Sequence, residues 1–244
     1  PLVAIKLTPP DLVLWITIIN IQGLVILCEF GLQPTIVRNY SYVRTGALSL
    51  NKSGINKKKT KSVNQQLFFD LLNSAKRIYS RIFLVGCAIS LFVATPYVYS
   101  IMLKHNIEFI NIGTWFIFIT ATLLNLYFGY LNALLLGWQK IKLNHQIIAS
   151  SKLIYLVLSF IFLLFDFGLL YVAISLLIAT GISRFITLKA ARSIILNNTC
   201  SLEKPKYSQD LTNVIWFNAK KMGIVQIAGF ILQRGGIIFS TYFL

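Results

Sequence analysis

The sequence predicts an all-α fold, a polytopic membrane helix bundle of about six transmembrane helices. Hydrophobic residues make up 56% of the 244 positions, and charged residues only 12%. Apolar runs long enough to cross a bilayer recur along the whole chain. These runs are longer than barrel strands and lack the alternation of apolar and polar residues that such strands show. The composition therefore argues against a soluble domain.

Six apolar runs have the length of a membrane span. They cover residues 12–28, 82–103, 110–138, 147–165, 168–188 and 222–244. The first span is expected to extend as a helix toward Arg38, and Pro96 is expected to kink the second. Two amphipathic stretches, 67–80 and 211–221, precede the second and sixth spans. We expect both to lie as helices at the membrane interface.

The basic residues predict the orientation of the bundle. Twenty of the 23 Lys and Arg residues fall in three alternate connections, at 38–81, 140–152 and 184–221. The positive-inside rule places these connections in the cytoplasm. The net charge of +16 therefore reflects membrane topology, and we expect no nucleic-acid partner. Attraction of the loop 51–66 to anionic membrane lipids is an alternative use of this charge.

Arg234 points most directly to a function. It lies 13 residues beyond Lys221, so it is about 20 Å deeper along a helix. That depth is near the middle of a hydrocarbon core roughly 30 Å thick. A guanidinium there costs about 2.5–3.5 kcal/mol on insertion and usually faces a polar cavity. The sequence therefore predicts a positively charged cavity, with Gln233 on the same helix.

Other polar groups in or near the spans are candidates for this cavity. Arg38 follows the first span, Tyr130 lies on the third and Arg184 ends the fifth. Snorkelling to the inner head groups is an alternative for both arginines. Glu29 is either a neutralising partner of a cation or an ion-coupling residue. Hydrogen bonds between helices are the alternative for the Asn and Gln residues, which are Asn20, Gln22, Gln33, Asn125, Asn132 and Gln226. The further polar groups are Tyr127, Ser151, Lys152 and Tyr155.

The sequence contains no recognisable catalytic constellation. The seven carboxylates, two histidines and three cysteines share no metal-ligand spacing. A nucleotide-binding P-loop is also missing. We therefore expect a protein that is not an enzyme and that needs no cofactor or metal. Arginine binds phosphate and pyrophosphate through charge-assisted hydrogen bonds, and neighbouring polar groups suit sugar hydroxyls, so a lipid-linked glycan fits such a cavity.

Two segments carry a family resemblance. Residues 7–47 contain an entry with two prolines, an EFGL motif at 29–32, then Arg38 and a Gly-Ala pair at 46–47. This order resembles the second-helix region of the O-antigen and polysaccharide flippases, except that Val13 or Leu14 stands where the family has a glycine. Residues 130–146 resemble the link between the fourth and fifth helices of that family. The order of apolar segments agrees over nearly the whole chain.

The resemblance implies a fold and a domain organisation. Flippases of the multidrug/oligosaccharidyl-lipid/polysaccharide exporter superfamily are inverted-V transporters of two pseudo-symmetric halves, with roughly twelve to fourteen helices. Residues 1–200 are then expected to hold helices two to six of the N-terminal half. Residues 201–244 are expected to hold a cytoplasmic linker and the first helix of the C-terminal half. The chain is accordingly expected to be a fragment.

The resemblance also implies a substrate. Such flippases move undecaprenyl-pyrophosphate-linked repeat units of O-antigen or another surface polysaccharide across the bacterial inner membrane, from the cytoplasmic to the periplasmic face. Arg38 and Arg234 match the implied cavity cations, and Glu29 is the candidate for ion coupling. The implied partners are the lipid-linked substrate, membrane lipids and other polysaccharide assembly proteins.

Several alternatives remain open at this point. A multidrug cation antiporter of the same superfamily would use buried carboxylates, among which Glu29 is nearly alone. A peptidoglycan-precursor flippase would show more arginines deep in the first spans. A membrane-embedded glycan polymerase or transferase would need longer outer loops than 104–111 and 166–167. A truncated, inactive gene would also account for the two ends of the chain.

Overall fold

The protein is all-α in the part that the structure describes. The computed structural model describes residues 6–29, 31–51, 54–55, 63–108, 111–198 and 209–243, without the side chains of 24, 26, 54–55, 209–210, 230–231 and 233–243. The helices are α2 (Pro9–Leu27), α3 (Leu32–Arg44), α4 (Gln65–Ile89), α5 (Thr95–Lys104), α6 (Asn111–Tyr127), α7 (Gly129–Gly137), α8 (Ile141–Leu164), α9 (Leu169–Asn198) and α10 (Gln209–Phe243). A small antiparallel hairpin pairs β1 (Leu50–Asn51) with β2 (Gly54–Ile55).

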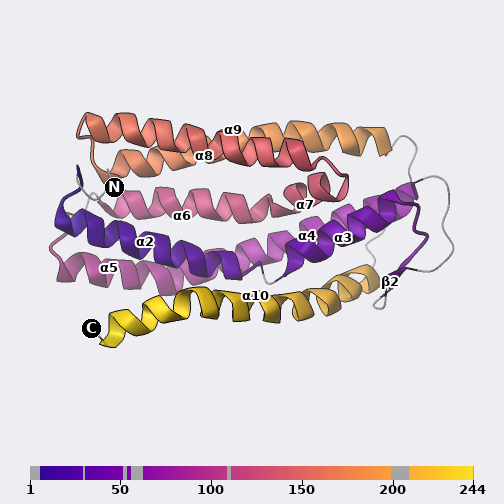
Figure 1. Ribbon diagram of the computed structural model, residues 1–244, viewed down its shortest axis with the longest axis horizontal. Coiled ribbons are helices and arrows are strands. Elements are labelled where there is room, and N and C mark those ends of the chain that lie inside the picture. Colours follow the sequence, from indigo (N-terminus) through magenta and orange to yellow (C-terminus); the bar gives the residue numbers. More distant parts are fainter. Residues whose placement is uncertain are drawn as a thin grey trace.

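The helices lie side by side along the long axis of the molecule (Figure 1). Helices α8 and α9 form one side, α6 and α7 follow, and α10 runs along the opposite edge beside α3 and α4. The β-hairpin, the α7–α8 link and the start of α10 lie at one end of the bundle. At the other end, Lys6 donates a hydrogen bond of 3.0 Å to Asp166. The described helix ends that flank the three basic connections therefore lie at one end of the bundle, an arrangement that the predicted orientation requires.

Four helical segments are long and apolar enough to cross a membrane. They are Gln65–Lys104, Asn111–Gly137, Ile141–Leu164 and Leu169–Asn198, and they match the second to fifth expected spans. These segments suggest a multi-pass membrane protein. Helices α2 and α10 cover the first and sixth expected spans. Some of their side chains lie outside the described residues, so their assignment as spans stays a prediction.

The stretch 67–80 is the first half of α4, not a separate surface helix. It continues without interruption through a π-helical turn, Ser90–Ala94, into α5. Its apolar stripe packs into the bundle because α3 and α7 cover that face. The buried stripe consists of Leu67, Phe68, Leu71, Leu72, Ala75, Ile78 and Tyr79. The second amphipathic stretch, 211–221, is likewise part of α10.

Three helical segments lose regular geometry inside the bundle. Helix α2 ends at Leu27, and Gly31 precedes α3 with a φ of 70°. Phe128 alone separates α6 from α7. The third irregularity is the π-helical turn, which lies just before Pro96, where a kink was expected. Proline lacks an amide hydrogen and so disturbs the turn before it.

Candidate functional site

The interruption between α2 and α3 places a carboxylate inside the bundle. Glu29 lies in this interruption and accepts a hydrogen bond from the hydroxyl of Tyr79, which is buried on α4. Gly129, directly after the α6–α7 interruption, faces both side chains. A Cβ atom on Gly129 would lie 2.5 Å from a ring carbon of Tyr79 and 3.1 Å from Oε1 of Glu29. The two interrupted segments therefore meet at Glu29, and discontinuous helices of this kind form binding sites in transporters.

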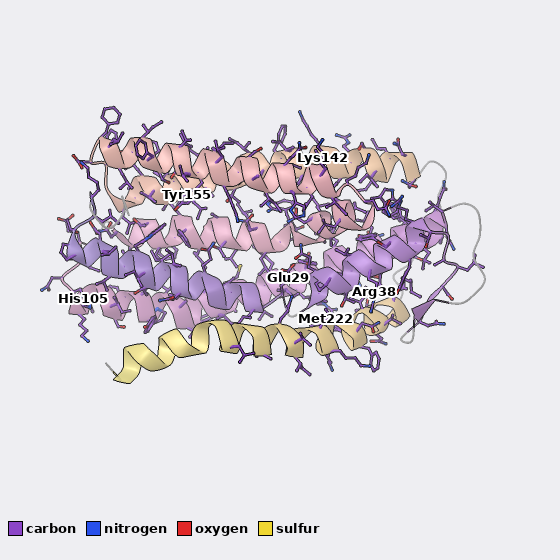
Figure 2. The ribbon with its side chains drawn as sticks, viewed as in Figure 1. Glu29, Arg38, His105, Lys142, Tyr155 and Met222 are labelled. Carbon is purple, nitrogen blue, oxygen red and sulfur yellow. The ribbon has the colours of Figure 1, made fainter. Side chains whose placement is uncertain are left out.

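Helix α10 closes over the same interruption (Figure 2). The backbone N–H of Gly31 donates to Oε1 of Gln226 at 2.7 Å. A Cβ atom on Gly31 would lie 2.5 Å from the backbone nitrogen of Gly223 and 2.7 Å from the carbonyl carbon of Met222. Glycine is required here twice, for its positive φ and for the approach of the α10 backbone. Figure 2 labels Glu29 and Met222 near this contact.

Arg184 of α9 binds both sides of the α6–α7 interruption. Its Nε donates to Oδ1 of Asn125 on α6 at 3.0 Å, and its Nη1 donates to Oδ1 of Asn132 on α7 at 3.2 Å. The guanidinium is thus held inside the bundle and does not snorkel to a surface. A guanidinium has five N–H donors, and the others have no acceptor among the described residues. Arg184 therefore retains donors for a ligand.

Arg184 and Glu29 line one cavity of about 300 Å³. Its polar wall consists of Gln22, Glu29, Gln33, Thr122, Asn125, Asn132 and Arg184. The two charged groups attract each other electrostatically, although the described residues contain no ion pair between them. Two opposite charges that face one cavity without contact offer it both a cationic and an anionic side.

A second cavity, of about 210 Å³, shares Gln22, Arg184 and both asparagines with the first. Its further polar lining consists of Ser151, Lys152, Tyr155, Thr180, Ser183 and Thr187. Lys152 was assigned from the sequence to a cytoplasmic connection. In the structure, α8 begins at Ile141, so Lys152 is eleven residues into the helix, about 16 Å from its start.

The other predicted site residues lie elsewhere. Tyr130 is buried and packs against Tyr79, with ring centroids 6.3 Å apart. It lines a third cavity of about 450 Å³, next to Lys189. Arg38 is exposed on α3 and lines none of these three cavities. The side chains of Gln233 and Arg234 lie outside the described residues.

The structure therefore brings Glu29 and Arg184 together from the predicted set. It adds Tyr79 to the site, places Lys152, one of the further polar candidates, beside Arg184 in the second cavity, and gives the two asparagines a definite role as acceptors for Arg184. The available signal for Tyr79 was its position on the apolar stripe of 67–80. Its pairing with a carboxylate 50 residues away in sequence left no local signal.

The described residues contain no group of three or more His, Cys, Asp or Glu side chains that could hold a metal ion. Comparison with protein-family models, with curated proteins and with solved structures gave no match. The chemistry of the cavity walls is therefore the basis for a functional proposal.

Proposed function

We propose that this protein translocates undecaprenyl-pyrophosphate-linked oligosaccharides, of O-antigen or another surface polysaccharide, from the cytoplasmic to the periplasmic face of the bacterial inner membrane. The observation that carries the proposal is Arg184, held by two amides in a polar cavity among helices apolar enough to span a membrane. Ionisable groups at such positions are costly, and they commonly line substrate or ion pathways.

The walls of the cavity suit both parts of such a substrate. The unused N–H groups of Arg184 can donate to phosphate oxygens in charge-assisted hydrogen bonds. The amides of Gln22, Gln33 and Asn132 combine donors and acceptors, as sugar hydroxyls require. A volume of about 300 Å³ is at the low end for ligand pockets. It therefore accommodates a head group or one sugar at a time.

Arg38 and Arg234 also have roles in this proposal. Arg38 is exposed near the middle of α3, in the half of the bundle that carries the basic connections, so we propose it as an entry contact for pyrophosphate from the inner leaflet. Arg234 on α10 is proposed as a further contact during translocation. Rocking of two halves about the interrupted helices would then expose the substrate to the other side.

Replacing Arg184 tests the proposal. In the full-length protein, Arg184→Ala is expected to reduce surface polysaccharide at least about tenfold and to accumulate lipid-linked precursor, because the loss of one charge-assisted contact costs about 1.5–3 kcal/mol. Surface polysaccharide is measured by gel and lectin staining, and precursor by lipid extraction. Membrane abundance of the protein is measured in parallel.

Two matched variants separate the charge from the packing. Arg81→Ala removes an exposed arginine from α4 and is expected to leave polysaccharide unchanged. Asn132→Ala removes one hydrogen-bond acceptor of Arg184 but keeps the cation, so its effect is expected to be smaller. Normal surface polysaccharide in cells with stably inserted Arg184→Ala protein would refute the proposed role.

A multidrug cation antiporter is the second candidate, because Glu29 lines the same cavity. A carboxylate in a membrane cavity can bind a cationic drug or a coupling ion. Drug efflux in inverted membrane vesicles distinguishes the two candidates. Efflux that needs Glu29 and persists in Arg184→Ala would favour the antiporter, whereas polysaccharide export that needs Arg184 would favour the flippase.

A further inference from the structure

The smaller cavity has an unbalanced charge. Lys152 and Arg184 both line it, and no carboxylate among the described residues does. The described part of the chain also contains no ion pair with either cation, since its salt bridge joins Lys6 to Asp166. Glu29 attracts Arg184 from the neighbouring cavity, but Glu29 does not line this one. Two cations thus face a space of about 210 Å³ without a counter-charge on its described walls.

The hydrogen-bonding groups of this cavity that have no partner among the described residues are mainly donors, and two of them are cationic. The hydroxyls of Ser151, Ser183 and Thr187 donate to backbone carbonyls at 2.8–3.0 Å, so their hydrogens are already used. The Oδ1 atom of Asn132 accepts from Arg184, which leaves the amide N–H₂ as a donor. Together with Lys152 and the remaining N–H groups of Arg184, these donors match a ligand with several anionic oxygens.

The size of the cavity limits the ligand. Pockets for whole small molecules usually measure about 300–1,000 Å³, so a cavity of about 210 Å³ takes a compact group. The carboxyl group of Glu29 lines the larger cavity and not the smaller one, so an anion in the larger cavity would lie beside an acidic group. Charge and size together therefore direct a phosphate-bearing group to the Lys152 side.

We propose that Lys152 and Arg184 form a subsite for a diphosphate group, and that Lys152 determines its affinity. This inference rests on the proposed function for the identity of the natural ligand, a lipid-linked diphosphate. The larger cavity, with its amides, then holds the uncharged sugars. Arg184 contacts both compartments and marks the boundary between the charged and neutral parts of the substrate.

Calorimetric titration of the purified full-length protein with inorganic pyrophosphate, in a neutral detergent, tests the subsite. Lys152→Gln is expected to weaken binding about tenfold or more, because one charge-assisted contact is lost. Lys152→Arg keeps the cation and is expected to bind within about threefold of the wild type, whose affinity is the reference. If the Gln variant does not fold, Lys152→Met gives the same readout.

Lys142 provides the matched control. It lies on the same helix (Figure 2) and is exposed, as Lys152 also is, but it lines none of the three cavities described above. Lys142→Gln removes the same charge and is expected to bind pyrophosphate like the wild type. Equal weakening in both variants would show a general charge effect and overturn the subsite. Unchanged binding in folded Lys152→Gln would also overturn it.

Two further measurements are needed. The first distinguishes a lipid head group from the proposed substrate as the source of the anion, and the second distinguishes failure of the subsite from failure of the proposed function. Competition by phosphatidylglycerol nanodiscs, but not by phosphatidylcholine nanodiscs, would support the subsite with a lipid head group as its ligand; competition by undecaprenyl pyrophosphate would support it with the proposed substrate. Binding that depends on Lys152, together with normal polysaccharide in the Arg184→Ala cells, would refute the flippase and keep the subsite. Polysaccharide loss only in Arg184→Ala, with pyrophosphate binding unchanged in Lys152→Gln, would refute the subsite alone.

Discussion

At the level of single residues, the site depends on a glycine, Gly129, because a side chain at this position would collide with its neighbours. Gly129 allows the ring of Tyr79 to reach Glu29 across the α6–α7 interruption. The hydrogen bond between them supplies a polar partner to a carboxylate that would be expensive to leave unpaired among apolar helices. The geometry around Glu29 is therefore sensitive to one added methyl group.

Gly129→Ala is expected to destabilise the protein by about 1–3 kcal/mol, because the new Cβ would overlap the Tyr79 ring and force it to move. This cost exceeds the helix-propensity gain of about 1 kcal/mol from glycine to alanine. Thermal unfolding in detergent measures the change. Gly181→Ala on α9 is the control, since its Cβ would meet nothing within 4 Å. A variant at Gly129 as stable as the one at Gly181 would contradict the packing described here.

At the level of elements, the packing of α10 on the α2–α3 interruption determines how α10 is placed in the bundle. The α2–α3 interruption is packed against α10, with the Gly31 N–H bonded to Gln226 and the backbone of Gly223 in close approach. A backbone contact cannot relax as a flexible side chain can. The seating of α10 therefore depends on the shape of this interruption.

Replacing Gly31 tests that contact. Gly31→Ala is expected to lower the melting temperature more than Gly168→Ala. Both glycines have a positive φ, 70° and 81°, so alanine pays a similar backbone cost of about 1–2 kcal/mol at each. Only the Cβ at Gly31 would meet the α10 backbone, whereas the Cβ at Gly168 would meet nothing within 4 Å. Equal losses of thermal stability would show that α10 does not press on the interruption.

At the level of the whole molecule, the alternating helices collect the basic connections at one end of the bundle. The Lys6–Asp166 ion pair belongs to the opposite end. Lys and Arg in short loops favour the cytoplasmic side. This rule therefore predicts that the α7–α8 link faces the cytoplasm and that the α8–α9 link faces the opposite side of the membrane.

Reporter fusions test this orientation in cells. A fusion after Gln139 is expected to give green fluorescent protein activity and no alkaline phosphatase activity, because that reporter would remain in the cytoplasm. A fusion after Phe167 is expected to give the reverse. The reporters are compared at equal expression by immunoblot. Phosphatase activity after Gln139 would invert the orientation and place the proposed entry contact, Arg38, on the wrong side.

Much of the site was visible as a list of polar residues but not as a constellation. Glu29, Arg184, Asn125 and Asn132 all stood out as polar groups in or near apolar runs. Their spacing did not reveal that Arg184 joins both asparagines across an interruption. Lys152 was counted with the basic connection 140–152 although it lies within the expected span 147–165, and α8 already starts at Ile141. A helix begins where backbone hydrogen bonding begins, which can precede the apolar run by more than a turn.

Sequence alone was sufficient for the all-α class, for four apolar helices long enough to cross a membrane and for the placing of the described helix ends beside the basic connections at one end of the bundle. Each of these depends on the local transfer of about 20 residues, or of a charged loop, between water and lipid, and such energies are nearly additive along the chain. The cavities depend on how the helices rotate and where they break, which packing between distant segments determines. That is why Glu29, Tyr79 and Arg184 form one site only in the folded bundle.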